Sequence, residues 1–371
     1  MKQLSVLIVI CFLCLQCKKV NTPQEPVLKN TSTTIKYAKG FDIITTEGKK
    51  TLLIKRAFQN TEKAFRFTLT NTPTTTKGEL QVPINSLVVT STTHIPMLEL
   101  LNSENTLIGF PNARYISSVK TRKRIDEGKV ADLGSEQDMN TETLLSIQPD
   151  LVIGFSLHPN NKLYNNIQKL GIPVLFNGDW LEETPLGRAE WIKVFGALLG
   201  KEKEADSIFT AIETEYLKAK KIALKNPNPP TILSGSMFKD IWNVPAGDSY
   251  IANFFKDANL NYLWKDTQGT GSLPLNFESV LDKGQQADFW LNCGLFTSKE
   301  TLLQANKHYS NFKAFTNNNV YSIAHNRGAT GGYIYFELSP VRPDWVLKDI
   351  IKITQPASLP DYTLHFFNKL D

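Results

Sequence analysis

The segment of residues 187–225 places the strongest constraint on how this chain can fold. It contains no proline, and its apolar residues recur at helical spacing. At about 1.5 Å per residue, one helix of this length would span a whole domain, although Gly200 could interrupt it. The apolar positions are Trp191, Val194, Phe195, Leu198, Leu199, Ala205, Ile208, Phe209, Ile212 and Tyr216. The sequence therefore predicts a long central helix with a folded unit on either side.

Strands and helices are predicted to alternate before this segment. Short apolar runs that are typical of buried strands are separated by stretches with helical periodicity. The strand candidates are residues 87–91, 106–110, 150–154 and 172–176, and the helix candidates are residues 95–101 and 140–147. Such alternation favours a parallel sheet that is covered by helices on both faces. It resumes at residues 231–235, after a proline-rich stretch.

A repeated pattern indicates that the two units are alike. Residues 140–150 begin with Asn-x-Glu and end with an Asp that starts a strand, and residues 276–288 do the same. A capping Asn and a first-turn Glu stabilise a helix N-terminus, so these residues are interpreted as structural. We predict an α/β protein with two Rossmann-like lobes, each with a parallel sheet, joined by one long α-helix. A ligand would lie in the cleft between the lobes.

The N-terminus has the order of a secretory signal, with Lys2 followed by an apolar run at residues 4–15. That run of about a dozen residues is shorter than the roughly 20 that span a bilayer as a helix. The following Leu15-Gln16-Cys17 resembles a bacterial lipobox, although Gln16 and Cys14 depart from the usual small and aliphatic residues. We expect a periplasmic lipoprotein with lipidated Cys17; the alternative is a soluble periplasmic protein that is cleaved nearby.

Six segments are expected in all. They are a signal peptide at residues 1–16, a lipid-anchored tether at 17–34, a small N-terminal β extension at 35–80, the first lobe at 81–186, the connecting helix at 187–228 and the second lobe at 229–371. The β extension is predicted as a hairpin because short β-rich pieces surround the turn at residues 47–49.

Composition narrows the possible partners and metal sites. The chain is 21% charged with a formal net charge of +5, and it has no Lys/Arg tract of the kind that binds nucleic acid. Three of the four cysteines lie in or beside the signal, so only Cys293 belongs to the folded part. One cysteine forms neither an internal disulfide nor a cysteine-rich metal site. We expect no nucleic-acid partner, no cofactor and no resident metal.

Three segments carry a family resemblance. Residues 139–154 (MNTETLLSIQPDLVIG), 170–174 (LGIPV) and 311–321 (NFKAFTNNNVY) occur in an order and spacing similar to those of the substrate-binding proteins of ABC importers for vitamin B12, iron–siderophores and haem. The resemblance covers roughly residues 82–370. It implies a monomer that binds a metal chelate between its lobes and delivers it to a membrane permease and its ATPase.

The same resemblance implies that an acidic residue on each lobe docks onto arginines of the permease. In the second lobe, residues 336–340 (FELSP) match the local pattern, so Glu337 is the candidate. In the first lobe the match slips by several residues, and Glu127 is preferred over Asp126, Asp132 and Glu136. For all of them the simpler interpretation is a solvated surface charge.

A planar or aromatic chelate requires large apolar faces and a few charged groups. Candidates should follow strands and face the cleft. The aromatic candidates are Phe155, Trp180, Trp242 and Tyr333 or Tyr335, and the polar candidates are Arg114 and Arg327. Packing in the core is an equally good explanation for each aromatic residue.

Two alternative functions remain open from the sequence. A binding protein for a bare transition-metal ion would use histidines, and His94, His158 and His325 do follow predicted strands. None of the five histidines forms a closely spaced pair, however. An exported hydrolase is the other alternative, but neither His-Glu-x-x-His nor Gly-x-Ser-x-Gly occurs. We therefore expect a binding protein rather than an enzyme.

Overall fold

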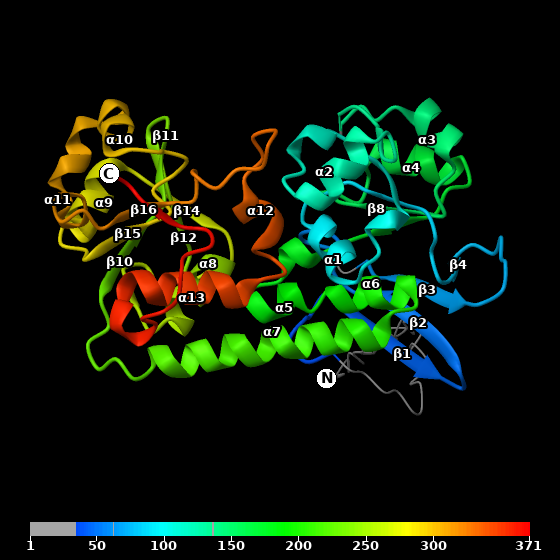
Figure 1. Ribbon diagram of the computed structural model, residues 1–371, viewed down its shortest axis with the longest axis horizontal. Coiled ribbons are helices and arrows are strands. Elements are labelled where there is room, and N and C mark those ends of the chain that lie inside the picture. Colours follow the sequence, from blue (N-terminus) through cyan, green and yellow to red (C-terminus); the bar gives the residue numbers. More distant parts are fainter. Residues whose placement is uncertain (1–34, 62, 136) are drawn as a thin grey trace, which may run out of the picture.

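The computed structural model describes residues 35–61, 63–135 and 137–371, and Figure 1 shows two α/β lobes above a long helix. The first lobe contains a five-stranded parallel sheet in the order β7-β6-β5-β8-β9. Its strands are β5 (Leu87–Val89), β6 (Leu107–Phe110), β7 (Ala131–Asp132), β8 (Leu151–Gly154) and β9 (Val174–Phe176), and its helices are α1 (His94–Leu100), α2 (Val119–Asp126), α3 (Thr141–Ile147) and α4 (Lys162–Lys169).

The second lobe contains a five-stranded sheet in the order β13-β10-β15-β16-β17, parallel except for the last strand. Its strands are β10 (Thr231–Ser234), β13 (Asn261–Tyr262), β15 (Phe289–Leu291), β16 (Val320–Ser322) and β17 (Asn368–Lys369). A separate antiparallel sheet adds β11 (Ser236–Phe238), β12 (Ile241–Pro245) and β14 (Ser272–Leu275). The helices are α8 (Tyr250–Asp257), α9 (Phe277–Gly284), α10 (Lys299–Ala305), α11 (Lys313–Thr316), α12 (Ile334–Leu338) and α13 (Pro343–Thr354).

The repeated pattern has the predicted structural role. Asn140 caps α3 by accepting a 2.9 Å hydrogen bond from the Thr143 amide, and Asn276 caps α9 in the same way. Asp150, just before β8, accepts the amide of Ser86 at 2.8 Å beside the neighbouring strand β5. In the second lobe Asp288 holds the first residue of β10 in the same manner. The prediction that these polar residues are structural is confirmed.

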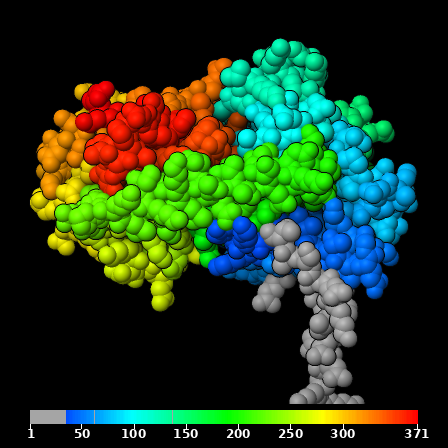
Figure 2. Space-filling model, turned by 60° about the horizontal axis from the view of Figure 1, so that its bottom comes forward, coloured from blue at the N-terminus to red at the C-terminus, as the bar shows by residue number. Residues whose placement is uncertain are grey.

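The central helical segment divides into three helices rather than forming one. They are α5 (Pro185–Ala189), α6 (Ile192–Leu199) and the 22-residue α7 (Glu202–Ala223). Gly200 ends α6 because it adopts φ +67°, a left-handed conformation that glycine adopts without steric cost. Helix α7 runs beneath both lobes (Figures 1 and 2), with Phe209 in the core of the first lobe and Tyr216 in that of the second.

The N-terminal extension forms a four-stranded sheet of β1 (Phe41–Thr46), β2 (Lys49–Ile54), β3 (Phe65–Thr70) and β4 (Glu79–Gln81). Strands β1 and β2 form the predicted hairpin. The extension shares the core of the first lobe, since Phe41 packs on Trp191 and Phe58 on Phe176 with ring centroids 4.8 and 4.9 Å apart.

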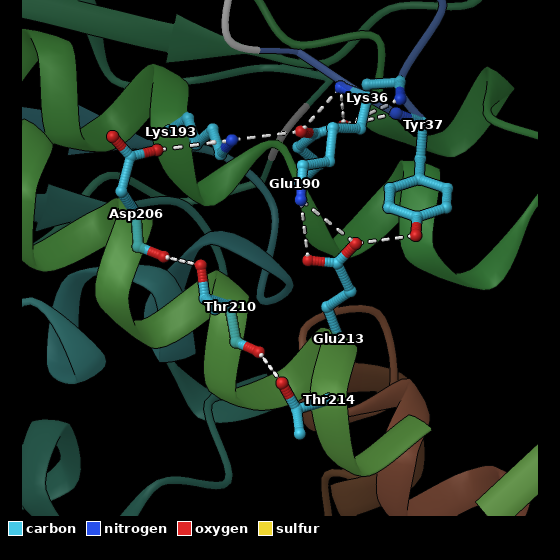
Figure 3. A network of polar contacts seen from close by, with 9 residues as sticks. Lys36, Tyr37, Glu190, Lys193, Asp206, Thr210, Glu213 and Thr214 are labelled. Carbon is cyan, nitrogen blue, oxygen red and sulfur yellow. Dashed lines mark hydrogen bonds and ion pairs between the residues drawn. The ribbon is translucent and has the colours of Figure 1, made fainter. Parts of the chain in front are cut away.

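Two buried carboxylates, Glu190 (Figure 3) and Glu182, fasten the start of the extension to the segment around α5. Glu190 accepts the backbone amides of residues 36–38 at 2.7 to 2.9 Å and pairs with Lys193 at 3.1 Å. Glu182 accepts the amide of Gly40 at 2.7 Å and the indole N–H of Trp191 at 3.0 Å. Because Tyr37 also donates to Glu213 of α7, this junction fixes the extension to the base shared by both lobes.

Within residues 35–61, 63–135 and 137–371, no helix is long and apolar enough to cross a membrane. Cys17 and the predicted tether lie outside the described residues. Short 3₁₀ turns complete the fold at Glu104–Thr106, Ala113–Tyr115, Asp179–Leu181, Lys307–Asn311 and Pro356–Ser358.

Candidate ligand site between the lobes

A cavity of ≈ 370 Å³ lies where the strands of the first lobe end. The carboxyl ends of parallel strands are where α/β sheets bind their ligands. The cavity is lined by residues 90–94 after β5, residues 110–112 after β6, Tyr115, Phe155 after β8, Asp179 and Trp180 after β9, Arg188 of α5 and Pro340 of the second lobe. The site is therefore built mainly by the first lobe and closed by the second.

Two of the predicted aromatic residues meet in this cavity. Phe155 and Trp180 lie edge to face, with ring centroids 5.4 Å apart. Tyr115, which was not predicted, adds a third ring that is 50% exposed. Arg114 does not line the cavity; its guanidinium lies over the Tyr115 ring at 4.8 Å. Together these rings provide an apolar surface at the mouth of the cleft.

The other predicted aromatic residues are placed differently. Trp242 is 0% exposed and stacks on Trp290 with centroids 5.2 Å apart, so it belongs to the core of the second lobe and not to the cleft. The reason is its position on β12, whose inward face packs on that core. Tyr335 is also buried, against Phe366.

Tyr333 and Arg327 belong to a loop of the second lobe that crosses to the first. The Arg327 guanidinium lies over the Tyr333 ring at 4.5 Å. In the same loop Thr330 donates a hydrogen bond to the carbonyl of Arg114 at 2.5 Å. A Cβ on Gly332 would lie 2.3 Å from the Tyr115 carbonyl oxygen, so only glycine allows this approach. Figure 1 shows this loop, before α12, reaching toward α2.

Glu337 is not the surface charge that the family resemblance implies. It is only 4% exposed, and its two carboxylate oxygens accept the backbone amides of Ser117 and Ser118 at 2.6 and 2.9 Å. Burial raises the pKa of Glu337 to about 7, against the opposing effect of these hydrogen bonds. In this arrangement Glu337 joins the lobes instead of facing a partner.

The first-lobe docking candidates do lie at the surface. Glu127 follows α2 and forms an ion pair with Lys129 at 2.7 Å, which lowers its pKa. Asp126 pairs with Arg122 at 3.0 Å, and Asp132 accepts the Gly134 amide. Glu136 lies outside the described residues.

The floor of the cavity holds ionisable groups that sequence reasoning did not select. Burial raises the pKa of Asp179 to about 6, even though the nearby Arg188 guanidinium opposes the shift. Arg188 stacks on the Tyr250 ring at 3.7 Å and donates to the Trp180 carbonyl at 3.0 Å. His94 is buried and its pKa falls to about 3, so it is neutral. The position of Asp179 just after a strand was a usable signal; Arg188 had none, because it lies within a helical pattern.

No group of three or more His, Cys, Asp or Glu side chains in the described part of the chain is arranged to hold a metal ion. His94 lies in the cavity wall, whereas His158 and His325 are exposed. Cys293 is buried, and burial raises the pKa of its thiol to about 12.

Two α/β lobes, one long helix beneath them and a cavity at the strand ends define a two-lobed solute-binding protein. The chain belongs to the periplasmic binding protein family, whose sequence profile matches residues 87–326. It is 29% identical over 301 residues to an uncharacterized lipoprotein of Methanocaldococcus jannaschii, covering 78% of this chain and 70% of that protein.

Solved structures share the fold. A periplasmic binding protein from Veillonella parvula superposes with a TM-score of 0.61 at 15% identity, covering 90% of this chain and 98% of that one. IsdE of Staphylococcus aureus, solved with haem, superposes with a TM-score of 0.53 at 18% identity. The superposition covers 73% of this chain and 98% of IsdE. The vitamin B12 binding protein of Vibrio cholerae superposes with a TM-score of 0.52 at 11% identity. The superposition covers 75% of this chain and 99% of that protein. The predicted fold class and family are confirmed.

Proposed function

We propose that this protein is the substrate-binding subunit of an ABC importer and captures one metal chelate in the cleft between its lobes. The observation that supports this most directly is the cavity itself, which is lined by the rings of Tyr115, Phe155 and Trp180 and by the half-buried Arg188. Aromatic faces with one well-placed cation suit a planar, partly anionic ligand. Proteins of the same fold bind haem and vitamin B12.

Capture of such a ligand requires the lobes to separate locally. The cavity of ≈ 370 Å³ is near the lower limit of small-molecule sites, and a tetrapyrrole with its side chains is larger. Residues 327–333 and Glu337 close the cleft on the second-lobe side. We propose that these contacts part as the ligand enters, while α7 and the junction at Glu190 hold the base of the lobes together.

Delivery follows from the importer proposal. The loaded protein would dock on its permease through Glu127, or through Asp126, Asp132 or Glu136, and the ATPase of the importer would drive release. Glu337 would contribute only once it is released from Ser117 and Ser118. We propose that lipidated Cys17 anchors the protein, as a monomer, to a membrane in the periplasm. The Methanocaldococcus relative described as a lipoprotein supports this.

Tryptophan fluorescence of the purified protein provides the test. Titration with cyanocobalamin, haemin and a panel of ferric siderophores should give saturable one-to-one quenching by at least one of them. Trp180→Ala should weaken binding by about ten-fold or more, since a buried aromatic contact contributes on the order of 1.5 kcal/mol or more. The matched control is Phe238→Ala, which removes an exposed ring that does not line the cavity.

The outcomes separate the alternatives. If no chelate binds, the chelate proposal fails. Turnover of a bound compound, instead of stoichiometric binding, would favour an enzyme. Equal affinities of the Trp180→Ala and Phe238→Ala proteins would show that the ligand binds elsewhere.

A further inference from the structure

Four buried polar atoms in the walls of one cavity lack a hydrogen-bond partner. They are Oδ2 of Asp179, Nε1 of Trp180, Nε of Arg188 and Nδ1 of His94. A buried polar atom without a partner costs on the order of 1–3 kcal/mol, and such atoms are uncommon in folded proteins. Their concentration around one cavity indicates groups that a ligand satisfies.

The neighbouring hydrogen bonds fix which of these atoms donate. The side-chain oxygen of Asn177 accepts the amide of Asp179 at 2.9 Å, so its nitrogen faces His94 Nε2 at 2.8 Å and donates to it. Neutral His94 then carries its proton on Nδ1. Trp180 Nε1 and Arg188 Nε are donors by their chemistry. Of these four buried atoms on residues that line the cavity, three are therefore unused donors and one, Asp179 Oδ2, is an unused acceptor.

Asp179 and Arg188 lie close enough to influence each other without bonding to each other. The Arg188 charge lowers the pKa of Asp179, yet Oδ2 of Asp179 and Nε of Arg188 both lack partners. Other contacts hold Arg188 in place, namely the Trp180 carbonyl and the Tyr250 ring. An acceptor and a donor without partners thus lie on two residues that line the same cavity, and a group that is both donor and acceptor complements them.

We propose that Asp179 and Arg188 recognise a carboxamide group of the ligand. Its carbonyl oxygen would accept from Arg188 Nε and Trp180 Nε1, and its N–H would donate to Asp179 Oδ2. This inference rests on the proposed capture of a chelate in the same cleft. It makes Asp179 a specificity residue, because a ligand carboxylate has no proton to donate and would meet the negative charge of Asp179.

The charges around Asp179 give this selectivity a pH dependence. Arg188 on α5 favours the ionised carboxylate, Glu182 opposes it, and His94 on α1 and Tyr250 on α8 are neutral near pH 7. In the ligand-free protein the Asp179 carboxyl has a pKa of about 6. A ligand N–H donor should therefore bind more weakly as the pH falls below about 6. An anionic ligand group should show the opposite trend.

Two probes separate the two ligand chemistries: cyanocobalamin, whose ring carries carboxamides, and haemin, whose ring carries carboxylates. Wild-type protein should bind cyanocobalamin more tightly, with affinity falling below pH 6. The affinity of the Asp179→Asn variant for cyanocobalamin should be lower by about ten-fold or more, since hydrogen bonds to charged groups contribute about 1.5–3 kcal/mol. The Trp180 amide lowers the pKa of Asp179, so an asparagine that keeps its oxygen toward this amide would turn its NH₂ toward the ligand N–H. Asp282→Asn, an exposed carboxylate on α9, is the matched control.

Failure of the inference differs from failure of the proposed function. Two results would show that the carboxamide inference is wrong while chelate capture stands. In the first, haemin binds more tightly than cyanocobalamin and Asp179→Asn strengthens the binding of haemin. In the second, Asp179→Asn leaves the affinity of every bound chelate unchanged. If no chelate binds the wild-type protein, chelate capture fails and the inference fails with it. Thermal unfolding of each variant establishes that its fold is intact. Trp180→Phe provides an independent check. It removes only the indole donor and part of the ring, so it should weaken the binding of cyanocobalamin.

Discussion

The junction of the N-terminal extension and the floor of the cleft both bury carboxylates, but they use them differently. At the junction Glu190 accepts three backbone amides and pairs with Lys193, and Glu182 accepts two amides and an indole N–H. In the cleft one oxygen of Asp179 has no partner. Buried charge is tolerated where hydrogen bonds replace its lost hydration. The carboxylates of the junction find their hydrogen-bond partners within the folded chain, whereas the cleft leaves one carboxylate oxygen available to the proposed ligand.

The largest expected effect is at the junction. Glu190→Ala should lower the free energy of unfolding by about 3–5 kcal/mol, because it removes the buried carboxylate that pairs with Lys193 and takes away the acceptor of the amides of residues 36–38. Urea unfolding followed by circular dichroism measures this. Glu183→Ala, a neighbouring half-buried carboxylate with surface partners, should cost less than about 1 kcal/mol. Equal losses in the two variants would refute the distinction.

A smaller effect of opposite sign is expected in the cleft. Burial raises the pKa of Asp179 from 3.8 to about 6, so the folded protein binds a proton more readily than the unfolded chain. Stability from this group is present at low pH and is lost as the pH rises from about 4 to about 6. Asp179→Asn should therefore stabilise the ligand-free protein by about 2–3 kcal/mol at pH 7.5 and have little effect at pH 4.

Urea midpoints at these two pH values measure the effect, with Asp282→Asn as the control for an exposed carboxylate. A variant that is destabilised at pH 7.5 would mean that the Asp179 carboxylate has the support seen for Glu190, and the contrast between the two regions would disappear.

The parts that the sequence predicted are those set by local patterns. Apolar periodicity located the strands and helices, and the Asn-x-Glu caps and the strand-starting Asp150 and Asp288 revealed the paired lobes because capping acts within a few residues. Gly200 was correctly considered a possible break. The long connecting helix was predicted correctly, but it begins at Glu202 and not at residue 187, since apolar spacing does not distinguish one helix from three in succession.

The site was harder to predict because its contacts join distant parts of the chain. Phe155 and Trp180 were found because they follow strands at the sheet edge. Trp242 also follows a strand, but it lies on the added β12, where alternation directs it into the core. The burial of Glu337 depends on amides 220 residues earlier in the sequence, which no local motif reveals. Arg188 reaches the cavity from within a helical pattern for the same reason.

The smallest expected effect concerns Glu337, a buried carboxylate that is intermediate between Glu190 at the junction and Asp179 in the cleft. Its two oxygens are satisfied, as at the junction, but by amides of the other lobe. If the lobes part here for ligand entry, Glu337→Gln should speed association of the chelate by about five-fold at pH 5, where Glu337 is protonated in the closed arrangement, since one hydrogen bond contributes a net of about 1 kcal/mol. Stopped-flow fluorescence measures this rate. Glu127→Gln, at the other end of α2, should not change it.

The pH dependence of the same rate tests the mechanism. Burial and the nearby Glu99 raise the pKa of Glu337 to about 7 in the closed arrangement, so deprotonation disfavours closure. The wild-type association rate should rise between about pH 5 and pH 7, after allowance for the Asp179 titration in the Asp179→Asn background. Glu337→Gln should flatten this rise. Thr330→Ala loses only the hydrogen bond to the Arg114 carbonyl, so it should speed association while the rise of the rate with pH remains. If neither variant changes the rate, ligand enters without parting these contacts, and Glu337 belongs with the carboxylates that only hold the fold.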